Sequence, residues 1–489
     1  MSESHRIVKN TIFLSIANTL PRITQMIVIF IAARLIGDVG LGKYYTIASV
    51  VALTNLFSDL GISTSFTKEV SIKKDQASKY FVNLFVVKLF LGCVTYLSLI
   101  VITYFLNYSI DIMNAAYIYG IYMAFWAFSG LFLSLFQAFE EMKYSALLWG
   151  VSGILNLVIS VFLLYNGANF MSPVWGLTVG SVVSFIIGAL IVRGQIKFSL
   201  SYLDWNFLKQ NLKLAFPFAI NSIFSSIYFR INSIILSKLV TEQVMGWFGS
   251  AFKMLDNLLI LPQFFLGAVY PVMCRLYRES QERFRSILNQ SLRVIAIGSF
   301  PISIGLFMLS QKTILFLYGP DFIGGTLSLE ILSFALLAIF FTSFQVITLM
   351  SMGKMKIVNL VGGINIFLNS FLSYVLISTW GANLSLNGAA LSTLVCEVFG
   401  LIIFTIYFLK KGLFNKESFY LLFKPIISGT IMGVIVYLIR DGNIFISVIV
   451  GIVVYFGVLL LMKGLSEKEL KIVKSLFKKN DLTKVENVE

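Results

Sequence analysis

The chain has 489 residues, of which 58% are hydrophobic and 12% are charged, and its mean hydropathy is +0.87. A soluble domain carries roughly a quarter charged residues, so this composition excludes a soluble protein and indicates a membrane protein. The formal net charge is +15, and the only histidine, His5, lies in the polar N-terminal segment. Histidine-based acid–base or nucleophilic catalysis therefore has no candidate within the apolar segments.

Apolar segments long enough to cross a ~30 Å hydrocarbon core as helices recur along the whole chain. We predict an all-α integral membrane protein with about fourteen transmembrane helices. The longest connection expected on the outer side, about residues 310–326, leaves no room for a soluble catalytic domain, and we therefore expect no enzyme. The predicted spans are approximately 11–34, 44–67, 80–106, 113–138, 145–165, 173–193, 214–237, 244–273, 292–315, 327–351, 357–378, 386–409, 422–440 and 443–462.

Lysine and arginine fall at alternate ends of these spans. With a cytoplasmic N-terminus, 29 of the 38 basic residues lie on the cytoplasmic side, 5 on the outer side and 4 within spans. Cytoplasmic loops of membrane proteins are enriched in these residues. We therefore expect a multi-pass protein of the cytoplasmic (inner) cell membrane with both termini cytoplasmic. Topology accounts for the positive charge, and no nucleic-acid partner is expected.

Two parts of the sequence resemble each other. The segment from Met142 to Gly150 aligns with Met355 to Gly363 at an offset of 213, and Asn156 then aligns with Asn369. Upstream, Gly42-Lys-Tyr aligns with Gly246-Trp-Phe at an offset of 204. An internal repeat of six spans enters the membrane in the same direction in both copies, which predicts two lobes related by a pseudo-two-fold axis along the membrane normal. The expected divisions are an N-lobe at 1–200 (spans 1–6), a C-lobe at 201–412 (spans 7–12), an appended helix pair at 413–463 and a cytoplasmic amphipathic tail at 464–489.

Arg22 lies about 11 residues, or about 17 Å, into the first span. A lipid-facing arginine at that depth costs at least about 2.5–3.5 kcal/mol, so Arg22 is expected to face protein or water. Internal pairing is the simpler expectation for Lys253 with Asp256, which are three residues apart on one helix, and for Asp59 with Lys88, which match in depth. The other ionisable residues at comparable depth are Asp59, Lys88, Arg230, Lys253, Asp256 and Glu397.

Arg22 and Arg230 remain after this pairing, with Glu397 as the only acid left at similar depth. Two arginines in one cleft would present planar forks suited to a diphosphate or a carboxylate. The candidate substrate-binding residues are Arg22, Arg230, Tyr228, Lys88 and Lys253, and the candidate ion-coupling residues are Glu397, Asp59 and Asp256. No metal site or cofactor is expected beyond a coupling proton or sodium ion.

Several motifs resemble the polysaccharide-biosynthesis flippases of the Wzx type, within the multidrug/oligosaccharidyl-lipid/polysaccharide (MOP) exporter superfamily. They are Arg34-Leu-Ile-Gly37, Gly42-Lys-Tyr44, Asp59-Leu-Gly61, Pro217, Tyr228-Phe-Arg230-Ile-Asn232, Gly246-Trp-Phe248, Pro262 and Tyr270-Pro271. The chain departs from the family pattern at Asn232, where an acidic residue is frequent. The resemblance implies a MATE- and MurJ-like fold that moves a polyprenyl-(di)phosphate-linked oligosaccharide to the outer leaflet by alternating access, as in O-antigen synthesis.

Membrane lipid and glycan-assembly proteins are the further partners that this resemblance implies. The alternatives are a multidrug exporter of the MATE type, which would favour a carboxylate-rich cavity, and a peptidoglycan-precursor flippase of the MurJ type. A membrane glycosyltransferase or glycan polymerase would need a long outer loop or an acidic catalytic cluster, and the sequence has neither. A channel is least favoured, because no segment resembles a selectivity filter.

Overall fold

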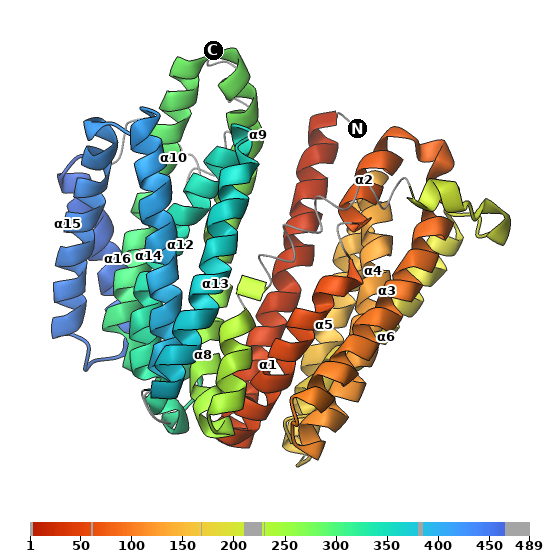
Figure 1. Ribbon diagram of the computed structural model, residues 1–489. Helices are drawn as coiled ribbons and strands as arrows, with labels where there is room; N and C mark the ends of the chain where they lie inside the picture. Colours follow the sequence, from red (N-terminus) through yellow and green to blue (C-terminus); the bar gives the residue numbers. More distant parts are fainter. Residues whose placement is uncertain are drawn as a thin grey trace. The chain divides into compact units, whose positions relative to one another are not determined.

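The computed structural model describes residues 3–59, 62–167, 169–209, 227–228, 230–379 and 385–464. All regular elements within these ranges are helical (Figure 1). The α-helices are α1 Glu3–Thr54, α2 Ile62–Ile72, α3 Ala77–Phe105, α4 Ile110–Ala138, α5 Met142–Tyr165, α6 Ser172–Arg193, α8 Glu242–Leu258, α9 Ile260–Glu279, α10 Gln281–Met308, α11 Ser310–Leu317, α12 Thr326–Ser351, α13 Met355–Thr379, α14 Ser385–Lys410, α15 Lys416–Leu438 and α16 Ile444–Leu461. The 3₁₀ helices are η1 Asn55–Ser58, η2 Lys74–Gln76, η3 Leu200–Tyr202 and η4 Pro320–Gly325.

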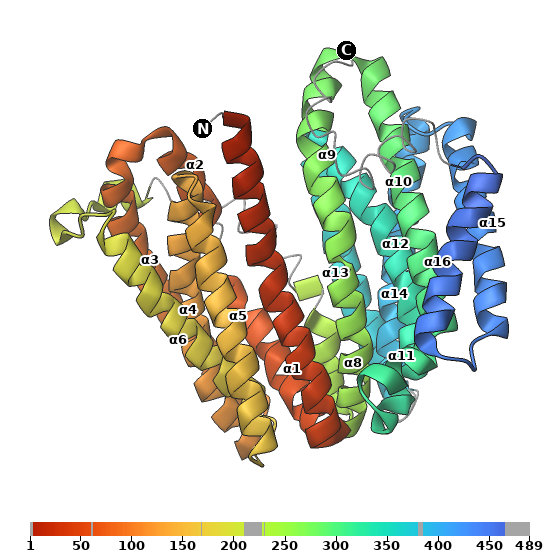
Figure 2. The same cartoon turned by 180° about the vertical axis from the view of Figure 1, so that it is seen from behind.

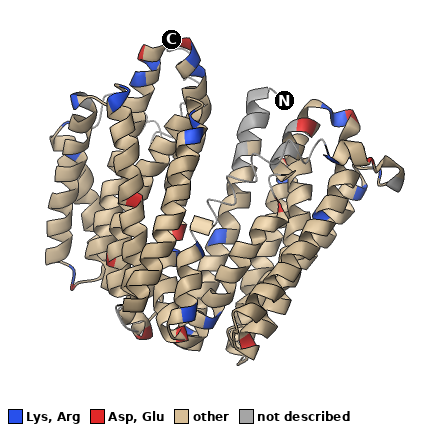
Figure 3. Ribbon diagram, viewed as in Figure 1, with Lys and Arg blue, Asp and Glu red and all other residues tan. Residues whose placement is uncertain are grey.

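Twelve helical segments in this part of the chain are long and apolar enough to cross a membrane. The prediction of an all-helical, multi-pass membrane protein is confirmed. Of the fourteen predicted spans, the first two are joined in one continuous segment, Phe13–Ser58. The predicted span 214–237 and the tail at 464–489 lie largely outside the described residues. Charged residues, coloured blue and red in Figure 3, are sparse along the middle of the helices.

The second predicted span, 44–67, is wrong as a single helix. Helix α1 instead runs through the first connection and bends at Gly37, whose φ of 67° is a left-handed conformation that glycine adopts without a steric penalty. It then ends at Thr54 and is followed by the short η1, and α2 begins only at Ile62. The predicted outer loop at 310–326 is likewise helical, because α11 and η4 occupy most of it.

The chain divides into two compact units, which we describe separately. Unit 1 comprises residues 1–257, 314–328 and 359–396, and unit 2 comprises residues 258–313, 329–358 and 397–489. The lobe boundaries expected from the repeat stay a prediction.

In unit 1, α1 packs against α5, α5 against α6, and α3 and α6 against α4 (Figures 1 and 2). Its buried core includes Phe66, Phe81, Phe132, Phe136 and Leu148. In unit 2, α15 packs against both α10 and α16. Tyr455 of α16 is fully buried there, and its hydroxyl donates to the Ile297 carbonyl of α10 at 2.9 Å.

Two pairs of repeat mates make equivalent contacts within unit 1. Asn156 of α5 donates to Gln25 Oε1 at 2.7 Å and accepts from Ser160 at 3.1 Å. Its mate Asn369 of α13 donates to the carbonyl of Tyr228 at 3.4 Å and accepts from Ser373 at 3.4 Å. Each asparagine thus bonds an upstream segment and the serine one turn further along its own helix, as expected of two copies of one motif.

The glycine mates meet each other. A Cβ atom added to Gly42 of α1 would lie 1.7 Å from the carbonyl oxygen of Glu242, and one added to Gly246 of α8 would lie 2.1 Å from the carbonyl oxygen of Asp38. Helices approach this closely only where small residues stand at the crossing. The glycines that mark the repeat in the sequence therefore allow α1 and α8 to cross backbone to backbone.

Candidate functional site

Helix α1 presents Arg22 away from its packed side. Pro21 and Thr24 face α5, where a Cβ at Gly153 would lie 3.1 Å from Pro21 Cα and 2.9 Å from Thr24 Oγ1. Arg22 is exposed on the surface of unit 1, and no described residue forms a hydrogen bond or an ion pair with it. The expectation that Arg22 faces protein or water stays a prediction.

Two of the predicted deep cations lie beside Asp256 of α8, and a third, Arg22, acts on it from a longer distance. Lys253 Nζ lies 3.4 Å from Asp256 Oδ2, which confirms the predicted pair. Arg230 Nη2 lies 3.9 Å from the same oxygen, and the charge of Arg22 also acts on Asp256 electrostatically. The inference that Arg230 remains unpaired is therefore wrong. We call Arg22, Arg230, Lys253 and Asp256 the cationic cluster.

The cationic cluster holds three positive charges and one negative charge, so it keeps a net positive charge. The side chains of Arg230, Lys253 and Asp256 are 31%, 29% and 33% exposed, so a ligand at the surface of unit 1 can reach them. Guanidinium groups bind carboxylates and phosphates with two parallel hydrogen bonds and stay charged when partly dehydrated. The arrangement suits an anionic group such as a phosphate.

The second predicted pair lies where the helix is interrupted. Lys88 of α3 is fully buried, donates to the carboxylate of Asp59, and also donates to the carbonyl of Ser58 at 3.2 Å. Asp59 also accepts from the backbone amide and the hydroxyl of Ser63. The helix break frees backbone groups that need partners in an apolar environment, and Lys88 and Asp59 supply them. The pairing is confirmed, and the ion-coupling and substrate-binding roles stay predictions.

The remaining candidates are placed elsewhere. Glu397 lies in unit 2, is buried, and accepts a hydrogen bond from Thr342 at 3.0 Å. Tyr228 is half-buried in unit 1, and its backbone carbonyl is bonded by Asn369. Asn232 is buried, accepts from Ser373 at 2.7 Å and donates to Thr393 at 2.8 Å. Both the oxygen and the nitrogen of the Asn232 side-chain amide therefore have hydrogen-bond partners.

Sequence reasoning missed a network at the α1–α8 crossing. Asp38 accepts from Gln243 Nε2 at 2.8 Å and from Trp247 Nε1 at 2.9 Å, and Trp247 also donates to the Asp321 carbonyl at 2.7 Å. The Gly42 and Gly246 motifs were the available signal, because they mark the crossing beside which these residues lie.

Residues 7–277 match the family of polysaccharide biosynthesis proteins, which is more than half of the chain. The chain belongs to this polysaccharide biosynthesis family. Its relatives include the "Putative O-antigen transporter" of Shigella flexneri, 21% identical over 79% of this chain and 94% of the relative. The capsular polysaccharide biosynthesis protein CapF of Staphylococcus aureus is 24% identical over 83% of this chain and 99% of the relative.

Solved structures show the fold of this polysaccharide biosynthesis protein. The lipid II flippase MurJ in an inward closed conformation aligns with a TM-score of 0.72 at 18% identity, covering 92% of this chain and 98% of MurJ. An inward-facing MATE transporter of the MOP superfamily aligns with a TM-score of 0.65 at 14% identity, covering 81% and 98%. The MurJ- and MATE-like fold is confirmed, and the family and fold agree with the prediction of a transporter and not an enzyme.

Proposed function

We propose that this protein is a flippase that moves an oligosaccharide linked to a polyprenyl phosphate or diphosphate from the cytoplasmic to the outer leaflet. The observation that carries the proposal is the cationic cluster, because Arg22 and Lys253 lie on two helical segments that are long and apolar enough to cross a membrane, and Arg230 adds to their surplus positive charge. The family match and the relative named for O-antigen transport support a glycan as the cargo.

In this proposal the cationic cluster holds the phosphate groups while the prenyl chain stays in the lipid. Arg22 has no described partner, so its guanidinium is available to a phosphate without breaking an existing ion pair. Arg230 and Lys253 share Asp256, which holds both cations in place until a second anion arrives. A cationic drug would meet net repulsion at this site, which disfavours the multidrug-exporter alternative.

The proposed direction of transport follows the distribution of basic residues in the sequence, with both termini cytoplasmic. Two hydrogen bonds within unit 1 support the assignment of several connecting segments to the same side of the membrane. The hydrogen bonds from Asn10 to Glu140 and from Gln195 to Glu141 join segments assigned to the cytoplasmic side. Alternating access between the two predicted lobes would then carry the head group across.

The test is reconstitution of the full-length protein in liposomes with a fluorescent polyprenyl-diphosphate oligosaccharide, scoring exchange between leaflets. Removal of a charge-assisted hydrogen bond costs about 1.5–3 kcal/mol, so Arg22→Ala is expected to slow transport about tenfold or more. Arg22→Lys keeps the charge but loses the planar fork, and an intermediate rate is expected. The matched control is Arg193→Gln, which removes an exposed arginine at the end of α6. Full-rate transport by Arg22→Ala would refute the role of the cationic cluster.

A further inference from the structure

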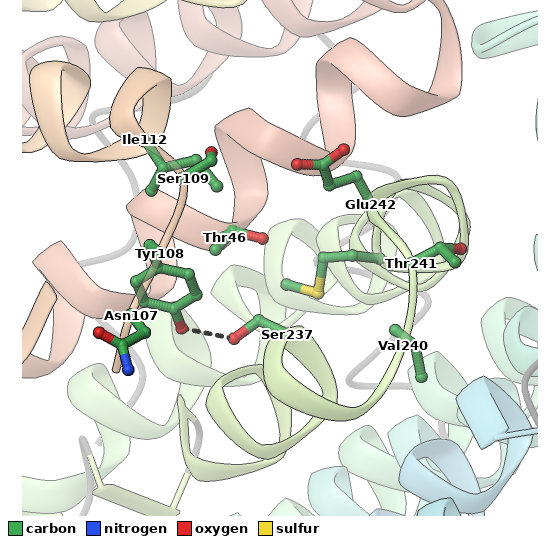
Figure 4. Close-up of a pocket in the computed structure, with 10 residues that line it drawn as sticks. Thr46, Asn107, Tyr108, Ser109, Ile112, Ser237, Val240, Thr241 and Glu242 are labelled. Carbon is green, nitrogen blue, oxygen red and sulfur yellow. Dashed lines mark hydrogen bonds between the residues drawn. The ribbon is translucent and has the colours of Figure 1, made fainter. Parts of the chain in front are cut away.

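Unit 1 has a cavity of about 310 Å³ between three segments of the chain (Figure 4). Its walls come from α1, from the connection between α3 and α4 with the start of α4, and from residues 237–245 at the start of α8. The orientation proposed above places the lining part of each segment near the outer side. The lining residues that matter below are Thr46, Asn107, Ser109, Ile112, Glu242 and Met245.

The close crossing of α1 and α8 brings the cavity's polar groups together. Because Gly42 has no side chain, the Glu242 carbonyl rests directly on α1. Thr46 lies one turn beyond Gly42 on the same face of α1, so its hydroxyl and the Glu242 carboxylate face the same space. Figure 4 shows the Thr46, Ser109 and Glu242 side chains around this space, each from a different segment.

Several of these polar groups have no partner within the described part of the chain. Thr46 is 3% exposed, yet its hydroxyl makes none of the hydrogen bonds found there. Ser109 stands at the N-cap of α4, but its side chain does not cap the helix. The Glu242 carboxylate forms no ion pair with a described residue. A nearly buried threonine hydroxyl aimed into a cavity leaves hydrogen-bonding capacity for a bound molecule.

One wall of the cavity is held in place by its own contacts. The Tyr108 hydroxyl and Ser237 Oγ are 2.7 Å apart, and this bond joins the α3–α4 connection to the helical segment that precedes α8. Lys238 Nζ lies 4.0 Å above the Tyr108 ring. Burial raises the pKa of Tyr108. The tyrosine is therefore a neutral structural contact that ties these two segments together.

The lining chemistry selects the class of ligand. Among the described lining residues the one charged group is the Glu242 carboxylate, which accepts hydrogen bonds from hydroxyl groups and repels phosphate, while Lys238 lies behind the lining on the Tyr108 ring. Hydroxyl and amide groups from Thr46, Ser109 and Asn107 add both donors and acceptors, while Ile112 and Met245 provide apolar surface. A sugar ring presents hydroxyl groups at its edge and C–H groups on its face, and the volume is at the small end of ligand pockets.

We propose that this cavity binds one neutral sugar unit of the glycan cargo at the outer end of unit 1. The inference rests on the proposed function for the identity of the cargo and for the side of the membrane. It adds a second point of contact, for the glycan, that is chemically distinct from the cationic cluster. The carboxylate of Glu242 accepts from sugar hydroxyls, and Thr46 and Ser109 complete the polar edge.

The test uses the full-length protein in nanodiscs and saturation-transfer NMR with free N-acetylglucosamine, galactose and glucuronate. The two neutral sugars are expected to bind, and glucuronate is expected to bind more weakly because its carboxylate faces Glu242. Loss of a hydrogen bond to a charged group predicts that Glu242→Gln weakens neutral-sugar binding about tenfold and removes the discrimination against glucuronate. Thr46→Val keeps the side-chain shape and is expected to weaken binding without unfolding.

The matched control is Asp111→Asn, which removes an acidic group near the start of α4 that does not line the cavity. Unchanged sugar binding in Glu242→Gln, or no binding of any of the three sugars to the natural protein, would overturn the inference. Flipping of the lipid-linked substrate by the natural protein would leave the proposed function standing in that case. Sugar binding that depends on Glu242, together with no flipping, would instead support the cavity and refute the proposed function.

Discussion

The Asp59–Lys88 ion pair lies where the helix is interrupted, and we expect the loss of stability to depend on which of the two residues is replaced. Lys88 has a side chain that is 1% exposed, whereas the Asp59 side chain is 40% exposed. Removal of one partner of a buried pair costs about 3–5 kcal/mol, because the other charge is left buried. Asp59→Asn leaves the buried Lys88 ammonium without its counter-charge, so we expect a loss of stability in that range.

Lys88→Met should cost much less. Methionine preserves most of the apolar stem, and the remaining Asp59 carboxylate is partly exposed and keeps both hydrogen bonds from Ser63. The lost attraction then resembles that of an exposed pair, about 1 kcal/mol or less. The double variant Asp59→Asn/Lys88→Met should be more stable than Asp59→Asn alone, since it contains no unpaired buried cation.

The assay is thermal unfolding of the four purified proteins in one detergent, followed by tryptophan fluorescence and read as a double-mutant cycle. We expect the natural chain to have the highest melting temperature, followed by Lys88→Met, then the double variant, and Asp59→Asn to have the lowest. If Lys88→Met melts as low as Asp59→Asn, burial of Lys88 does not determine the energetics of the pair, and the reasoning is refuted.

Two further predictions concern contacts of unit 1. Gly42→Ala should lower the melting temperature by several degrees, because the new Cβ would overlap the Glu242 carbonyl. The control is Gly92→Ala, whose new Cβ would have no neighbouring atom within 4 Å, and it should leave the melting temperature unchanged. A hydrogen bond from Lys79, at 2.9 Å, is the main cause that lowers the pKa of Asp204 below 3.8. The stabilisation from a lowered carboxyl pKa is present above 3.8 and is lost as pH falls through the lowered value. Limited proteolysis of the segment 196–209 should therefore accelerate below that pH, and Asp204→Asn should remove this dependence. Cleavage that is independent of pH in the natural chain would count against it.

Depth and spacing were sufficient to predict the two ion pairs from sequence. Lys253 and Asp256 share a helix face, and Asp59 and Lys88 lie at matched depth on consecutive spans. These relations are set by the rise per residue of a helix and by the membrane thickness. The glycine repeat likewise gave the correct position of a special contact, although its meaning as a helix crossing appeared only in the structure.

Local breaks and long-range partners were not predictable in the same way. The segment around Asp59 is apolar enough for a continuous helix, and the partner that satisfies the freed Ser58 carbonyl, Lys88, comes from α3. Arg230 and Asp256 come from different helical segments, and hydropathy does not encode their approach. The cavity near Glu242 combines three segments, so no single stretch of sequence reveals it.

The backbone contact between α1 and α8 has a mechanical consequence. At the Gly42–Gly246 crossing the two main chains touch directly, and beside it the ring of Tyr45 from α1 fills the space that a side chain at Gly249 of α8 would need. A change of the crossing angle would therefore displace the Tyr45 ring and break the hydrogen bonds that Asp38 accepts from Gln243 and Trp247. The main-chain contact and the hydrogen bonds to Asp38 therefore act together to hold α1 and α8 at one crossing angle.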